Sequence, residues 1–298
     1  MLLDESDALA VTRLSAQLTN KRFKGDFMTS NLLARSLAIS CVAMALTFGA
    51  AVAQDTSKPF EPRVGQAGKD VVWVPTPQGL VDRMLDMARV TVEDTVIDLG
   101  SGDGRTVITA ARRGVKAMGI EYNPDMVALS KKNATAAAAD LATFVEGDIF
   151  KSDFSSATVI TLFLLPDLNL RLRPILLDMK PGTRVVSNTF DMGDWQPDDR
   201  VAATNGCTSY CRASFWVVPA KVAGTWQLPE GELTLEQEYQ MLKGNLKTAS
   251  GSTAITNGKM RGEQITFMVG DRIFTGKVAG NKMDGVFATE TKWEATKR

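Results

Sequence analysis

The stretch "VIDLGSGDGR", residues 96–105, decides the fold of this chain. An apolar run ends in an acid and is followed by Gly100, Gly102 and Gly104 at alternate positions. A buried strand that leads through a glycine turn into a helix is typical of open α/β sheets, which bind ligands at the carboxyl ends of their strands. Glycine permits the tight turn and lets a ligand approach the backbone closely. The stretch therefore predicts a nucleotide-type ligand site.

The glycine spacing and the acids of the turn narrow the choice of ligand. Dinucleotide sites use G-x-G-x-x-G and place a pyrophosphate on a helix N-terminus, whereas this turn reads G-x-G-x-G. Asp98 and Asp103 would repel a phosphate, but they would attract the ammonium and sulfonium groups of S-adenosylmethionine. The pattern therefore favours this cationic, phosphate-free cofactor and disfavours a nicotinamide oxidoreductase.

Two more acids follow the next two predicted strands. Glu121 ends the second strand, where a carboxylate can accept hydrogen bonds from ribose hydroxyls. Asp148 ends the third strand, where a carboxylate can reach the exocyclic amine of adenine. Together with Asp98 and Asp103, these side chains predict one ligand site at the edge of the sheet.

Alternating strands and helices extend from residue 71 to about residue 220, which predicts an α/β fold with a doubly wound, mostly parallel Rossmann-like sheet. After Gly224, turn signals separate short alternating runs, which predicts a small antiparallel β-meander or barrel-like region. The expected helices are 77–90, 105–114, 124–140 and 168–180, the last cut by Pro174, and the expected strands are 94–100, 116–122, 142–148, 157–166, 183–190 and a hairpin of 198–206 with 210–220.

The first part of the chain has the layout of a secretory signal. Residues 36–53 are uncharged and mostly apolar, follow Arg35, and end in a small-x-small site at 51–53. We therefore expect an N-terminal extension and signal peptide at 1–53, which starts at Met1 or at Met28, and a linker at 54–70. An α/β domain at 71–220 and a β-rich domain at 221–298 follow. The chain is expected to be exported and periplasmic; the alternative is an uncleaved membrane anchor, which would be its only membrane contact.

Composition excludes several kinds of site. The 298 residues carry a formal net charge of zero, so nothing indicates nucleic-acid binding. The chain contains no histidine, which excludes a Ser-His-Asp triad and the common zinc sites, and we expect no metal.

Cys207 and Cys211 form an even pair in a chain predicted to be exported, which favours a disulfide over two free thiols.

Three stretches resemble, in order, the motifs of the seven-strand, class I S-adenosylmethionine-dependent methyltransferases: "DLGSGDGR" (98–105), "GIEYNPDMV" (119–127) and "EGDIFKSDF" (146–154). The chain is further similar to the small lysine methyltransferases of the ATP synthase c-subunit and the adenine nucleotide translocase. That similarity covers about 71–198 and is carried by "VPTP" (74–77), "EYNP" (121–124), "DIFK" (148–151), "LFLLP" (162–166), "PGTRVVS" (181–187) and "DWQP" (194–197). The export signal, the β-rich end and the cysteine pair depart from that group.

The resemblance implies which residues form the site. It places Asp98, Gly100, Ser101 and Gly102 at the methionine part, Glu121 at the ribose, and Tyr122, Asp148 and Ile149 at the adenine. Gly104 is also expected to bind the cofactor, and Pro75, Thr76, Leu165 and Pro166 are expected at the mouth where the acceptor enters. Asp103 is the acid that we would test as a base.

The expected reaction is methyl transfer by in-line displacement, in which the enzyme positions the donor and desolvates the nucleophile. A lysine acceptor must arrive neutral, which burial favours by lowering its pKa. The sequence therefore predicts an S-adenosylmethionine-dependent methyltransferase that acts on protein lysines. A methyltransferase of small molecules and a non-catalytic cofactor-binding protein of the cell envelope are the alternatives.

Overall fold

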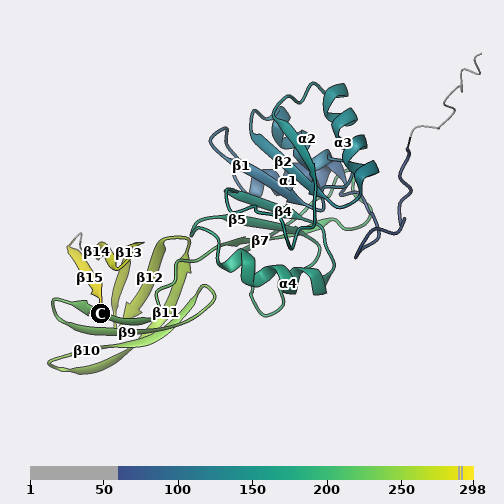
Figure 1. The fold of residues 1–298 in the computed structure, drawn as a ribbon. Coiled ribbons are helices and arrows are strands. Elements are labelled where there is room, and N and C mark those ends of the chain that lie inside the picture. Colours follow the sequence, from purple (N-terminus) through teal and green to yellow (C-terminus); the bar gives the residue numbers. More distant parts are fainter. Residues whose placement is uncertain (1–59, 288, 290) are drawn as a thin grey trace, which may run out of the picture. The chain divides into compact units, whose positions relative to one another are not determined.

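The computed structural model describes residues 60–287, 289 and 291–298. The predicted signal peptide and the first residues of the predicted linker, 54–59, lie outside this range. The described chain forms a helix-flanked sheet followed by a β-barrel (Figure 1). Within the described residues, no helix combines the length and the apolar character needed to cross a bilayer.

The sheet has seven strands in the order β3-β2-β1-β4-β5-β7-β6. All neighbouring strands pair in parallel except β7, which is antiparallel to both β5 and β6. This confirms the predicted doubly wound sheet and its terminal hairpin. The strands are β1 (Thr95–Leu99), β2 (Lys116–Glu121), β3 (Ala142–Glu146), β4 (Val159–Leu162), β5 (Arg184–Asn188), β6 (Asp199–Ala202) and β7 (Arg212–Val217).

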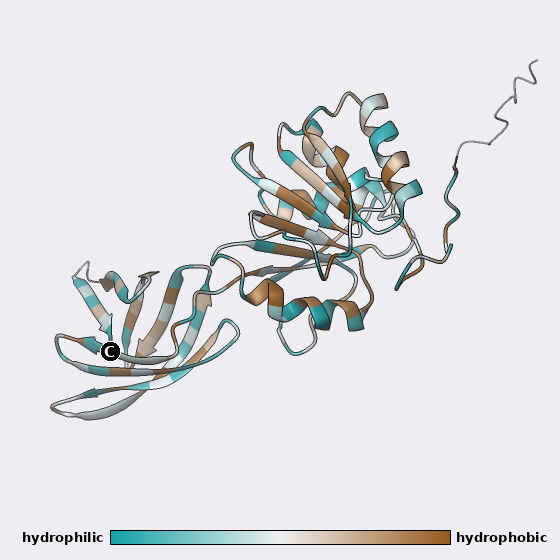
Figure 2. Cartoon of the chain, in the orientation of Figure 1, coloured by the Kyte–Doolittle hydropathy of each residue, from teal (hydrophilic) through white to brown (hydrophobic). Residues whose placement is uncertain are grey.

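Helices cover both faces of the sheet because its central strands are apolar on both sides. On β1, Val96 packs into a cluster with residues of α1 (Gln78–Met87), α2 (Arg105–Arg112) and α3 (Pro124–Ala136). Ile97 and Leu99 belong to a second cluster that contains residues of α4 (Pro166–Leu177). The hydrophobic colouring of the central strands in Figure 2 follows this double burial.

Helix α4 differs from its prediction at both its start and its middle. It begins at Pro166, because proline suits the first helical position, where its missing N–H costs nothing. It then runs through Pro174, so the predicted cut there is wrong. Leu168, Leu172 and Leu176 lie four residues apart on one buried face, and their packing offsets the hydrogen bond that Pro174 cannot donate.

The β-rich region after Val222 is a closed antiparallel barrel, which confirms the barrel-like prediction. Its order is β10-β11-β12-β13-β14-β15-β8-β9, so no edge strand remains unpaired. Buried aromatic rings, among them Phe267, Phe274 and Trp293, fill its interior. The strands are β8 (Gly224–Leu228), β9 (Gly231–Glu238), β10 (Met241–Thr248), β11 (Gly251–Arg261), β12 (Gln264–Val269), β13 (Arg272–Ala279), β14 (Lys282–Phe287) and β15 (Lys292–Lys297).

Candidate functional site

A cavity opens at the carboxyl ends of β1, β2, β3 and β4. The segment 66–76, which precedes α1, contributes to its wall. This is the edge at which parallel α/β sheets bind ligands. Eleven of the predicted site residues line the cavity: Pro75, Thr76, Asp98, Gly100, Ser101, Gly102, Asp103, Glu121, Tyr122, Asp148 and Ile149.

The three alternate glycines all adopt a left-handed backbone, with φ of 79° at Gly100, 55° at Gly102 and 83° at Gly104. Gly102 must lack a side chain because a Cβ there would lie 2.6 Å from the indole nitrogen of Trp73. Gly104 does not line the cavity. It caps α2, and a Cβ there would lie 2.7 Å from the ring of Phe144, which gives it a packing role; its cofactor contact stays a prediction.

Asp98 is a buried carboxylate at the bottom of the turn. Its Oδ1 accepts a hydrogen bond of 2.6 Å from the hydroxyl of Thr161. Burial raises the pKa of Asp98 to about 7, and the nearby negative charges of Glu121 and Asp103 act in the same direction. A bound cation would favour the charged carboxylate, so this position suits the ammonium group of a cofactor.

Glu121 is held in place by the backbone on both sides of it. Its Oε2 accepts the Gly102 N–H and its Oε1 accepts the Asn123 N–H, each at 2.9 Å. Each carboxylate oxygen can accept a second bond, so the predicted contact to ribose hydroxyls remains available.

Asp148 and Tyr122 share a partner that the sequence did not reveal. The Lys69 ammonium lies 2.7 Å from Asp148 Oδ2 and 4.6 Å from the centre of the Tyr122 ring. The hydrogen bond from Lys69 lowers the pKa of the Asp148 carboxyl and raises the pKa of Lys69. Lys69 therefore lies beside the predicted adenine position.

Lys69 belongs to a short hairpin over residues 65–73. Gly65 N–H donates to Trp73 O at 2.8 Å, and Trp73 N–H donates to Gln66 O at 2.9 Å. Part of the predicted linker thus forms a wall of the cavity. The sequence predicted only a linker over residues 54–70, and nothing local indicated what its residues would contact.

Asp103 is engaged with Arg105. The guanidinium donates to both carboxylate oxygens, with Nε 3.0 Å from Oδ1 and Nη2 2.6 Å from Oδ2. Arg105 also donates to the carbonyl oxygen of Thr76 at 3.0 Å. This arrangement ties the glycine turn to the segment before α1. It lends no support to Asp103 as a base, and that role stays a prediction.

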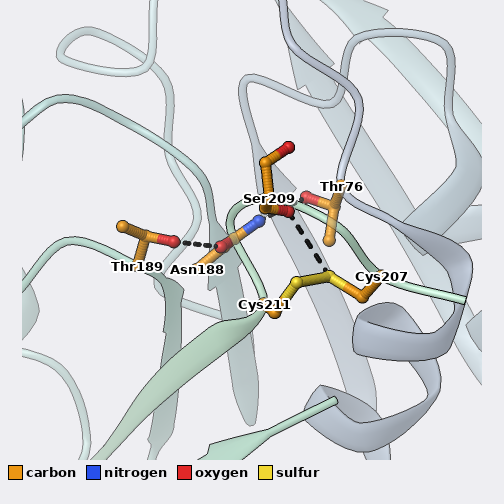
Figure 3. Close-up of a disulfide and its surroundings, with 6 residues drawn as sticks. All are labelled: Thr76, Asn188, Thr189, Cys207, Ser209 and Cys211. Atoms are coloured by element: carbon orange, nitrogen blue, oxygen red, sulfur yellow. Dashed lines mark hydrogen bonds between the residues drawn. A yellow bond between two sulfur atoms is a disulfide. The ribbon is translucent and has the colours of Figure 1, made fainter. Parts of the chain in front are cut away.

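The mouth of the cavity is only partly where the sequence placed it. Pro75 and Thr76 line it, and Asn188 donates to the Thr76 hydroxyl at 3.1 Å. Leu165 and Pro166, the cap and first residue of α4, are not among the residues that line it, although Leu168 of the same helix is. Phe163 and Leu164, from the same "LFLLP" stretch, line it instead. The predicted disulfide between Cys207 and Cys211 is present, in a loop beside Asn188 and Thr76 (Figure 3).

The residues of the cavity fit S-adenosylmethionine. Ser101 Oγ is buried and, among the residues that the structure describes, has no hydrogen-bond partner. Ser101 lines the same cavity as the buried Asp98, so both a hydroxyl and a carboxylate are available to a methionine-like group. No cluster of metal-binding side chains occurs within the described residues. The strand order and this site define a class I S-adenosylmethionine-dependent methyltransferase.

Comparison with known proteins identifies the family. Residues 98–199 match the model of the ANTKMT methyltransferase domain. A protein-lysine N-methyltransferase of Saccharolobus islandicus is 43% identical over 46% of this chain and 87% of its own length. The lysine N-methyltransferase of the ATP synthase c-subunit from Mus musculus is 30% identical over 60% of this chain and 68% of its own length. The chain belongs to this methyltransferase family and is an enzyme that uses S-adenosylmethionine.

A solved structure is also similar in sequence. It is an RNA methyltransferase of Salinibacter ruber in complex with S-adenosylhomocysteine, 49% identical over 50% of this chain and 96% of that chain, with a TM-score of 0.47.

Proposed function

We propose that the chain methylates the ε-amine of lysine side chains in a protein. The observation that carries this proposal is that three acids of the cavity already have partners, while the buried Asp98 is assigned to the ammonium group of the cofactor. Glu121 accepts two backbone N–H groups, Asp103 pairs with Arg105, and Asp148 pairs with Lys69. Transfer to a hydroxyl requires a base, whereas a neutral amine needs only position and desolvation. The relatives named as lysine methyltransferases support the same acceptor class.

The chain's own residues would bind and orient the reactants. Asp98 and Ser101 would hold the methionine end, Glu121 the ribose, and Asp148 with Ile149 the adenine. The cofactor supplies an activated methyl group on its sulfonium. The apolar wall formed by Pro75, Phe163 and Leu164 would exclude water from the incoming amine and favour its neutral form. The lysine loses its proton to solvent before it enters.

The test is transfer of labelled methyl from S-adenosylmethionine to a lysine-rich protein. The matched control is the same protein after its lysines have been acetylated, because an amide nitrogen cannot accept the methyl group. We expect label only on the unmodified acceptor, recovered as methyllysine after hydrolysis. Label confined to small molecules would favour the alternative methyltransferase, and cofactor binding without any transfer would favour the non-catalytic alternative.

We further propose that the protein is exported. The signal-like residues 36–53 support this, as does the Cys207–Cys211 disulfide, since disulfides persist mainly in oxidising compartments. Residues 1–53 should direct a reporter enzyme that is active only outside the cytoplasm. The control carries Ala43→Arg and Leu46→Arg, which interrupt the apolar run. Equal reporter activity from both fusions would refute export. Fractionation of the full chain then separates a cleaved, soluble form from an anchored one.

A further inference from the structure

Three aromatic rings from separate segments meet beside the cavity. Phe163 follows β4, Phe190 follows β5, and Tyr210 lies in the Cys207–Cys211 loop between β6 and β7. The ring centres are 5.2 Å apart for Phe163 and Tyr210, 6.2 Å for Phe163 and Phe190, and 6.5 Å for Phe190 and Tyr210. We call these three residues the aromatic cluster.

The aromatic cluster adjoins the place where the methyl group would be offered. Phe163 itself lines the cavity. Phe190 follows Asn188 by two positions, and Asn188 donates to Thr76, which also lines the cavity. Figure 3 shows Asn188 between Thr76 and Thr189, next to the disulfide loop that carries Tyr210. The cluster thus stands at the acceptor side of the site.

The aromatic cluster is accessible to solvent, unlike the aromatic residues that stabilise the protein by packing. Tyr210 is 42% exposed, and Phe163 and Phe190 are half-buried. In the barrel, Phe267 and Phe274 are fully buried. Rings that served only to fill a core would be buried in the same way, so the exposure of the cluster indicates a surface that receives a ligand.

The backbone holds two positions of the cluster region in conformations that non-glycine residues rarely adopt. Thr189 has a φ of 63° and Tyr210 a φ of 54°. Backbone strain of this kind persists where the surrounding structure enforces it, and it is found most often at functional sites. Here the enforcing contacts are the Cys207–Cys211 disulfide around Tyr210 and the hydrogen bond of 2.8 Å from Thr189 N–H to Arg212 O. The disulfide loop therefore positions Tyr210 against Phe163 and Phe190.

We propose that the aromatic cluster is the subsite for the acceptor's lysine side chain and its methylated products. This inference rests on the proposed function and names the residues that recognise its substrate. During transfer the lysine nitrogen bonds to the methyl carbon as the carbon–sulfur bond breaks, and the electron pair of that bond goes to sulfur. Positive charge moves onto nitrogen. Aromatic faces stabilise such a cation without accepting a proton, and they receive methylated ammonium groups well. Asp191, beside Phe190, pairs with Arg200 and does not supply a free charge.

The test compares two peptides that differ by one atom and its charge. One contains trimethyllysine, and the other carries the tert-butyl analogue in which carbon replaces the ammonium nitrogen. Calorimetric titration of the full chain with S-adenosylhomocysteine present should show tighter binding of the charged peptide, roughly 3- to 30-fold. The preference should fall below about twofold in the Phe190→Leu and Tyr210→Leu double variant. Tyr210→Phe, which keeps the ring, should retain it.

Phe287→Leu provides a matched control, because Phe287 is a half-buried ring of the barrel. It should leave the preference unchanged, and all variants should bind S-adenosylhomocysteine as the wild type does, which shows that they are folded. Equal binding of the two peptides by the wild type, or a full preference in the double variant, would overturn the inference. Preferential binding of the charged peptide without any lysine methylation would instead refute the proposed function and leave the subsite standing.

Discussion

At the scale of single residues, the site combines a buried carboxyl group with glycines at positions where any side chain would clash with a neighbouring ring. Asp98 is the charged group under the glycine turn, and burial keeps its pKa near neutrality at about 7. Gly102 and Gly104 leave room for Trp73 and for Phe144, respectively. Asp98, Gly102 and Gly104 lie in one short stretch of sequence, but their partners do not. Asp98 accepts a hydrogen bond from Thr161, and the two glycines face Trp73 and Phe144.

The raised pKa of Asp98 predicts a pH-dependent affinity for S-adenosylmethionine. A cationic ligand favours the charged carboxylate, so binding must release the Asp98 proton whenever the free enzyme holds it. Below pH 7 the affinity should therefore fall, by up to about tenfold for each pH unit, and above pH 7 it should level off.

Calorimetric dissociation constants between pH 5.5 and 8.5 measure this effect. Asp98→Asn is the control, because it keeps an oxygen that can accept from Thr161 but cannot titrate, and it reports the titration of the ligand alone. The same pH profile in both proteins would contradict the prediction.

Gly104→Ala should destabilise the protein by about 2–4 kcal/mol. The left-handed φ of 83° costs part of this, and the contact of the new Cβ with the Phe144 ring costs the rest. Gly182→Ala is a matched control with a φ of 94° and open space around its Cβ, so it should cost only the backbone part, about 1–2 kcal/mol. Urea unfolding of the two variants gives the difference, and equal losses would show that Phe144 is not the obstacle.

At the scale of elements, the hairpin over residues 65–73 turns an open sheet edge into a walled cavity. Its tip carries Lys69 onto Asp148, and its end carries Trp73 onto Gly102. An exposed ion pair of this kind contributes little to global stability. Its effect is on the placement of the hairpin, and therefore on access to the predicted adenine position.

Trp73 should report cofactor binding. It is half-buried beside Gly102, whereas the other four tryptophans, Trp195, Trp216, Trp226 and Trp293, are almost fully buried away from solvent. Titration with S-adenosylhomocysteine should shift the tryptophan emission to shorter wavelength as water leaves the indole. Trp73→Phe should abolish the shift while binding persists by calorimetry. A shift that survives in Trp73→Phe would place the ligand elsewhere.

At the scale of the whole molecule, the Cys207–Cys211 disulfide bears on stability and on the proposed acceptor subsite. The Cys207–Cys211 disulfide closes a short loop between β6 and β7, with a sequence separation of 4. Closure of so short a loop restricts the unfolded chain by about 2 kcal/mol in the chain-entropy account. Because disulfides persist mainly in oxidising compartments, this bond supports the proposed export.

Reduction of the disulfide should lower the free energy of unfolding by about 2 kcal/mol. The measurement is urea unfolding with and without dithiothreitol. The double variant Cys207→Ser and Cys211→Ser should match the reduced protein and should not respond to the reductant. A wild type whose unfolding midpoint ignores dithiothreitol would show that the link does not restrain the fold.

Local patterns accounted for much of this molecule. The α/β alternation, the barrel after Gly224 and the glycine turn at Gly100 follow from apolar periodicity and turn chemistry, which act over a few residues. The acids Asp98, Glu121 and Asp148 could be placed at one edge because parallel strands end on the same side of a sheet. The cut at Pro174 was wrong because packing of the leucine face of α4, a tertiary effect, outweighed a local rule.

The sequence alone established the sheet, the barrel and the chemical class of the cofactor, because these depend on residue types at short spacing. Tertiary structure decided the rest. It placed Gly104 against Phe144, put Phe163 and Leu164 in the cavity wall, and joined Lys69 to Asp148 across 79 positions of sequence. It also gathered the aromatic cluster from three loops. Such contacts depend on how strands and loops are placed in space, and no short-range spacing in the chain encodes them.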